Sequence, residues 1–183
     1  MPLIVDSHQD LAWNILSFGR DYTRSAYETR RMEAGSPTVE RNGDTLLGWL
    51  EYQQGNVVVV FATLFSTPAR WAYDWETCIY KDAREANQRY RQQLDIYHRL
   101  TDEHPDKFHL IGSASDLDNV LASQQKTDPN GQGYPVGLLL SMEGAEGILD
   151  VDELEEWWEW DCASSALLGQ GRASAVAQKN LVP

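Results

Sequence analysis

The chain has 183 residues, enough for one domain with a core, and its 42% hydrophobic and 23% charged residues are typical of a globular protein. Its formal net charge of −13 argues against binding to nucleic acids and to anionic membranes, because both need clustered Lys and Arg. No apolar run is long enough to span a membrane, no signal-peptide pattern begins the chain, and the two cysteines form no disulfide framework, so we expect a cytoplasmic protein with reduced thiols.

Apolar runs predict four β-strands, and the segments between them predict helices. The clearest strand is "NVVVVFATLF", a β-branched run typical of a strand buried on both faces. Residues rich in charge, Gly and Ser at 18–44 predict a loop or excursion over the end of the sheet. The expected strands are residues 2–6, 56–65, 107–112 and 134–144.

Each predicted strand is followed by a helical pattern. The second helix should be capped by Asp44 or Thr45, and the fourth should be opened by Ser113 or Ser115. This strand–helix alternation, four times over, predicts parallel strands and an α/β fold. The expected helices begin within residues 11–16 and span 44–55, about 75–103, 113–125 and 150–160.

His8 and Asp10 stand two residues apart after the first predicted strand. Alternate residues of a strand share a face, so an imidazole and a carboxylate there could bind one metal ion such as zinc. A His–Asp hydrogen bond, or a helix cap by Asp10, would also account for the pair. Glu143 follows the apolar run of the fourth strand. Because parallel strands end at the same edge of a sheet, we expect these three donors to converge.

The stretches "VDSHQDLAWN", "GNVVVVFATLF" and "LLLSMEGAEGI" make the chain resemble the membrane (renal-type) dipeptidase family of zinc metallopeptidases, over residues 2 to about 160. The resemblance implies a (β/α)₈ TIM-type barrel that binds two zinc ions and hydrolyses dipeptides through a metal-bound hydroxide. His8 and Asp10 would bind one zinc ion, and Glu143 would bridge both. The resemblance assigns no residue here to substrate binding or proton transfer.

The resemblance also implies two later histidines for the second ion, and no His follows Trp160. An eight-stranded barrel needs about 250 residues. We therefore expect residues 1–160 to be the first half of a truncated barrel, inactive alone. Residues 161–183 lack a clear strand pattern and are rich in Ala, Ser and Gly, so we expect an aberrant tail, frameshifted or disordered.

Two further functions stay open at the level of the sequence. The chain could be another amidohydrolase-like, metal-dependent hydrolase that acts on a cyclic amide or an ester, although His-x-Asp favours the dipeptidases over the His-x-His of that broader group. It could also be a non-enzymatic half-barrel that completes its fold with another chain, as a homo-oligomer for example.

Overall fold

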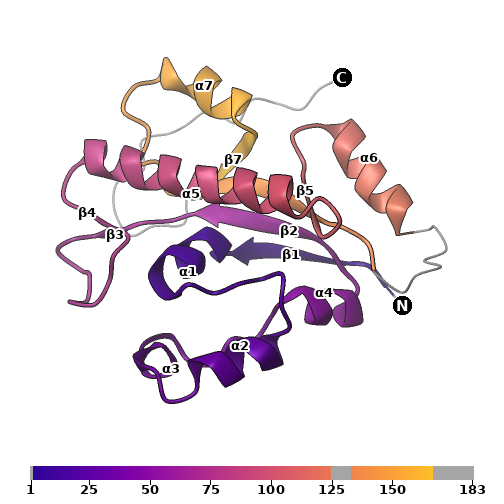
Figure 1. Cartoon of the computed structure of the whole chain (residues 1–183). Helices are drawn as coiled ribbons and strands as arrows, with labels where there is room; N and C mark the ends of the chain where they lie inside the picture. Colours follow the sequence, from indigo (N-terminus) through magenta and orange to yellow (C-terminus); the bar gives the residue numbers. More distant parts are fainter. Residues whose placement is uncertain (1, 125–132, 167–183) are drawn as a thin grey trace.

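The computed structural model describes residues 2–124 and 133–166 (Figure 1). All four expected strands form, and β1 extends further along the chain than the predicted range of 2–6. The strands are Ile4–Gln9 (β1), Val57–Leu64 (β2), Thr67–Pro68 (β3), Ile79–Tyr80 (β4), Phe108–Leu110 (β5), Val136–Glu143 (β6) and Cys162–Ala166 (β7). The helices are Leu11–Phe18 (α1), Ala26–Glu33 (α2), Pro37–Asn42 (α3), Trp49–Gly55 (α4), Ala83–Glu103 (α5), Ala114–Ser123 (α6) and Glu153–Glu159 (α7).

The main sheet is parallel throughout, in the order β1-β2-β6-β5, and β7 also pairs with β6. This parallel sheet with alternating strands and helices confirms the predicted α/β class. The short β5 pairs with the start of β6, whereas β7 pairs with the end of β6, from Leu140 to Glu143. The strand predicted at 107–112 therefore does not separate β2 from β6, which pair directly.

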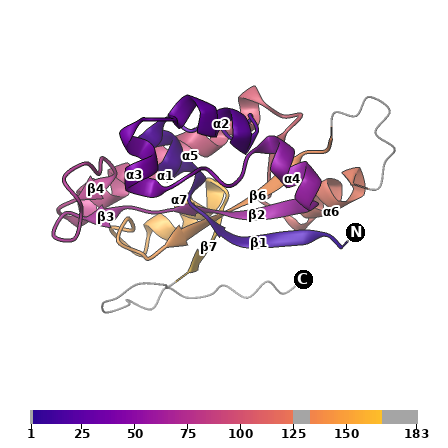
Figure 2. The same cartoon turned by 90° about the horizontal axis from the view of Figure 1, so that it is seen from below.

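The core lies on both faces of β2 and β6, which explains why these strands read as continuous apolar runs. On one face, α1 and α5 cover the sheet, and Tyr97 and Leu138 belong to the main cluster of buried side chains. On the other face, a smaller cluster joins Val59 of β2 to Val120 of α6. Helices α1 and α4 contact β2, whereas α2 and α3 lie further from the sheet, as Figures 1 and 2 show together.

The prediction of a loop at 18–44 is wrong in part, because this segment contains the helices α2 and α3. Local capping explains why a polar segment becomes helical. Ser25 and Glu28 form a reciprocal capping box at the start of α2. Ser36 caps α3, and Pro37 occupies its first turn, where a missing N–H costs nothing.

Two further helix boundaries differ from the expected ones. Helix α4 begins at Trp49 after Gly48, not at Asp44 or Thr45. A Cβ on Gly48 would lie 2.2 Å from the Arg24 carbonyl oxygen, so glycine alone permits this close approach. The segment 75–82 is not helical, because Ile79 and Tyr80 pair with β3 and Asp82 then caps α5.

The region predicted as an aberrant tail begins with β7, so residues 162–166 are in the sheet. Their Ala- and Ser-rich composition did not predict a strand, because these residues have low β-propensity. The strand forms through its hydrogen-bonded pairing with β6. The rest of the predicted tail lies outside the described residues. Among the helices of residues 2–124 and 133–166, none is both long and apolar enough to cross a membrane.

Candidate metal centre

The three predicted donors meet at the carboxyl ends of β1 and β6. His8 lies near the end of β1, Asp10 follows it as the residue before α1, and Glu143 is the last residue of β6. Because β1, β2 and β6 run parallel and adjacent, both strand ends lie at the same edge of the sheet. This convergence follows from topology, as the sequence predicted.

The distances between the donors suit one metal ion. His8 Nε2 lies 3.2 Å from Glu143 Oε2 and 3.6 Å from Asp10 Oδ1. A tetrahedral zinc site with bonds of 2.0–2.2 Å places its ligand atoms about 3.3–3.6 Å apart. All three residues offer ligand atoms within 4.8 Å of one another, and their side chains remain 24–36% exposed. One imidazole and two carboxylates therefore fit a zinc-type cation that solvent can reach.

The geometry gives little support to a helix cap or a His–Asp hydrogen bond as the role of the His8–Asp10 pair. Asp10 precedes α1, but its side chain makes no capping hydrogen bond. The 3.6 Å between His8 Nε2 and Asp10 Oδ1 is too long for a hydrogen bond. Asp10 instead accepts a short hydrogen bond from the hydroxyl of Thr63 on β2.

Glu143 lies in an electrostatic environment that disfavours its charged form. Burial raises the pKa of Glu143 most, and the charges of Asp10 and Glu146 raise it further, while His8 lowers it. The carboxylates of Asp10 and Glu143 repel each other, and a cation between them would offset that repulsion.

The backbone around Glu143 is held by a turn and by a tyrosine. Gly144 adopts a left-handed φ of +82°, which turns the chain directly after the donor. The Tyr90 hydroxyl of α5 donates to the Glu143 carbonyl oxygen at 2.9 Å. The end of β6 is thus fixed both by its turn and by α5.

Aromatic side chains pack directly beside this edge of the sheet. Trp13 of α1 lies 6.5 Å from Phe65, which follows β2, and 6.4 Å from Trp75, measured between ring centroids. The buried Trp13 Nε1 has no hydrogen-bond partner in the part of the chain that the structure describes. The sequence did not single out this cluster, because its members come from three separate segments.

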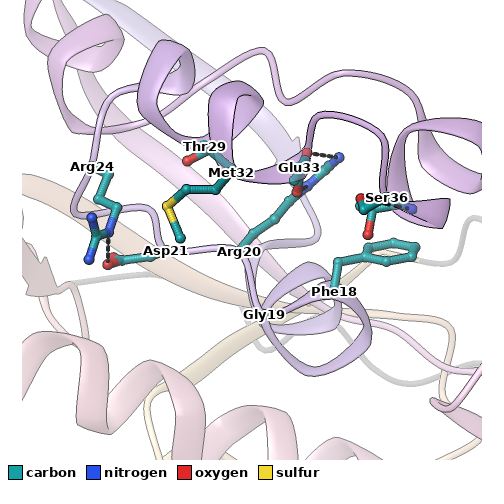
Figure 3. A pocket seen from close by; sticks show the side chains of 10 residues that line it. Phe18, Gly19, Arg20, Asp21, Arg24, Thr29, Met32, Glu33 and Ser36 are labelled. Atoms are coloured by element: carbon teal, nitrogen blue, oxygen red, sulfur yellow. Dashed lines mark hydrogen bonds and ion pairs between the residues drawn. The ribbon is translucent and has the colours of Figure 1, made fainter.

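A hollow of about 210 Å³ lies among α1, α2 and α3, away from the three donors (Figure 3). Its charged side chains are already paired: Arg20 with Glu33, and Arg24 with Asp21. None of the predicted donors lines this hollow. Its chemistry is that of a structural ion-pair network, so the sheet edge is the better candidate site.

No sequence pattern predicted the residues that support the donors. Thr63 stands inside the apolar run of β2, and Tyr97 stands in a long polar helix, with no pattern that links either to Asp10. A hydroxyl within a buried strand is the one local signal, since a buried hydroxyl needs a partner. Its partner becomes visible in the folded chain alone.

No protein-family model matches the chain, and a search of curated protein sequences gave no match. Solved structures are similar in fold. The chain matches a structure described as the probable dipeptidase PvdM from Pseudomonas aeruginosa, with a TM-score of 0.60 and 14% identity over 89% of this chain and 34% of that one.

Two other solved structures match with TM-scores of 0.56 and 18% identity, again over 89% of this chain. One is dipeptidase AC, described as a metallopeptidase of family M19, of which 43% is covered. The other is a metallopeptidase from Rhodobacter sphaeroides with a phosphinate mimic of the dipeptide L-Ala-D-Ala, of which 44% is covered. The chain thus spans 34–44% of the length of these structures, and the likeness shows the fold.

Proposed function

We propose that this chain carries a metal-binding site of a dipeptidase-like hydrolase, with His8, Asp10 and Glu143 as the protein ligands. The observation that carries the proposal is the convergence of one imidazole and two carboxylates at the carboxyl end of a parallel sheet. The fold shared with dipeptidase structures supports the choice of a dipeptide as substrate. Zinc is the metal we propose, because mixed nitrogen and oxygen donors suit it.

A bound zinc ion would polarise the peptide carbonyl and lower the pKa of a water molecule toward neutrality. His8 and Asp10 would hold the ion at the end of β1, while Glu143 would hold it from β6. The resemblance to the dipeptidases implies that Glu143 bridges two ions. The described residues hold one group of three suitable donors. Three is the number of protein ligands that a catalytic zinc ion usually has, with water or substrate as the fourth.

Zinc titration by isothermal calorimetry tests the site directly. We expect one zinc ion per chain, and binding at least about tenfold weaker in Glu143→Gln, because the amide removes a charged ligand. Glu146→Gln is the matched control, since Glu146 lies three residues away and outside the three-donor group. Equal losses in the two variants would contradict the assigned ligand set.

A peptidase assay with L-Ala-D-Ala and added zinc tests the catalytic part of the proposal. We expect zinc binding without measurable turnover by the chain alone, because the residues that the structure describes hold one three-donor group, which takes one ion, whereas the dipeptidase mechanism uses two. Turnover that disappears in Glu143→Gln would show that the chain is a complete catalyst, and would overturn this expectation.

The edge strand β1 favours a second candidate function, association with another copy of the chain. Within the described residues β1 pairs with β2 alone, and Leu3, Ile4 and Val5 are 50%, 44% and 57% exposed. An edge strand that begins with exposed apolar residues, as β1 does at Ile4 and Val5, can pair with another chain. Light scattering should then give a mass above that of one chain, and Val5→Lys should return it to a monomer. A wild-type monomer at all concentrations would exclude this function.

A further inference from the structure

We propose that Thr63 is a positioning residue, whose hydroxyl fixes the carboxylate of Asp10 for metal binding. This inference rests on the proposed metal site and adds a residue to it. Thr63 touches neither substrate nor metal in this scheme and acts through Asp10.

The topology places Thr63 beside Asp10. Gln9 of β1 is in register with Ala62 of β2, so the next residues of both segments are neighbours at the sheet edge. The Thr63 hydroxyl donates a short hydrogen bond to Asp10 Oδ1. Two residues that are 53 positions apart in the chain therefore meet where the donors converge.

The hydroxyl of Thr63 is buried and needs the hydrogen bond to Asp10. Thr63 is 1% exposed and lies in an otherwise apolar strand. A buried hydroxyl without a partner is destabilising, and Asp10 is its hydrogen-bond partner among the residues that the structure describes. Because threonine is β-branched, its side chain has few rotamers, so the bond also restricts rotation of the Asp10 carboxylate.

Tyr97 of α5 holds the backbone on both sides of this bond. Its hydroxyl donates to the Thr63 carbonyl oxygen at 2.8 Å and accepts from the Ala12 N–H at 3.1 Å. Ala12 lies two residues beyond Asp10, so Tyr97 ties the end of β2 to the start of α1. Tyr97 is fully buried, and this burial raises the pKa of its hydroxyl, which therefore stays protonated and able to donate.

These hydrogen bonds form an outer layer of support for Asp10, one of the three proposed metal ligands. Asp10 is held by a side-chain bond from Thr63, and the two segments that carry them are joined by Tyr97. Removing an outer hydrogen bond to a metal ligand typically weakens metal binding by about 10- to 100-fold. We expect that range for loss of the Thr63 hydroxyl.

The test compares Thr63→Val, which replaces the hydroxyl with a methyl group, with Thr63→Ser, which keeps it. The readout is the zinc dissociation constant from calorimetry with zinc alone, with urea unfolding of the zinc-free proteins as a check on folding. We expect Thr63→Val to bind zinc about 10- to 100-fold more weakly and Thr63→Ser to stay within about threefold of wild type. Thr63→Ala gives the same comparison if the valine variant does not fold.

Each outcome decides a different claim. Wild-type zinc affinity in folded Thr63→Val, or equal weakening in Thr63→Ser, would overturn the role of the hydroxyl and leave the metal site standing. If the wild-type protein binds no zinc, or if Glu143→Gln binds zinc as tightly as wild type, the metal site and this inference are both overturned.

Discussion

Removing one partner of the buried ion pair between Arg20 and Glu33 should destabilise the polar segment 18–44 more than breaking an exposed ion pair does. Arg20 Nε donates to Glu33 Oε1 at 2.8 Å, and Arg20 Nη2 donates to Glu33 Oε2 at 3.2 Å (Figure 3). The two side chains are 6% and 9% exposed. Arg20 also donates to Asn14 and to the Gly43 carbonyl oxygen, so this one guanidinium connects α1, α2 and the end of α3.

Glu33→Gln keeps the shape of the side chain and removes its charge. One oxygen can still accept from Arg20, but the amide nitrogen faces a donor, and the buried cation loses its counter-charge. Removing one partner of a buried pair costs about 3–5 kcal/mol. Because Asn14 and Gly43 still accept from Arg20, we expect the lower end, about 3 kcal/mol.

Urea unfolding measures this cost. With a slope of about 2 kcal/mol/M, a loss of 3 kcal/mol lowers the midpoint by about 1.5 M urea. Arg24→Gln is the control, because it breaks the neighbouring Arg24–Asp21 pair, whose side chains are 49% and 40% exposed. We expect at most about 1 kcal/mol there. If Glu33→Gln costs no more than Arg24→Gln, the reasoning from burial is refuted.

Three further variants test the fold by urea unfolding. Ser25→Ala removes the capping box of α2 and should lower the free energy of unfolding by about 1 kcal/mol, with no loss if the box is unimportant. Gly144→Ala should cost about 1–2 kcal/mol, because an L side chain is strained at a φ of +82°. Phe108→Ala should cost about 3–5 kcal/mol, since Phe108 is fully buried, and a loss below about 1 kcal/mol would contradict its place in the core.

The strands and the donors could be predicted because their signals are local. The β-branched run of β2 has no polar face, which indicates a strand buried on both sides, and the structure confirms this. His8, Asp10 and Glu143 each follow an apolar run, and parallel topology then brings them to one edge. Their proximity follows from these two facts, whereas their role as ligands stays a prediction.

The remaining features depend on contacts that the sequence does not display. The helices at 26–42 form in a polar segment through capping residues and the buried partner of Arg20. The strand at 162–166 has small residues with weak β-propensity, and it forms by pairing with β6. The partner of Thr63 is 53 positions away and is brought to it by strand register and by the hydrogen bonds of Tyr97.

Crystals of the protein soaked in zinc, with diffraction measured on both sides of the zinc absorption edge, test the central claim most directly. The account predicts an anomalous peak within bonding distance of His8, Asp10 and Glu143, about 2.0–2.2 Å from each ligand atom. Crystals saturated with zinc that show no peak at this edge of the sheet would contradict it.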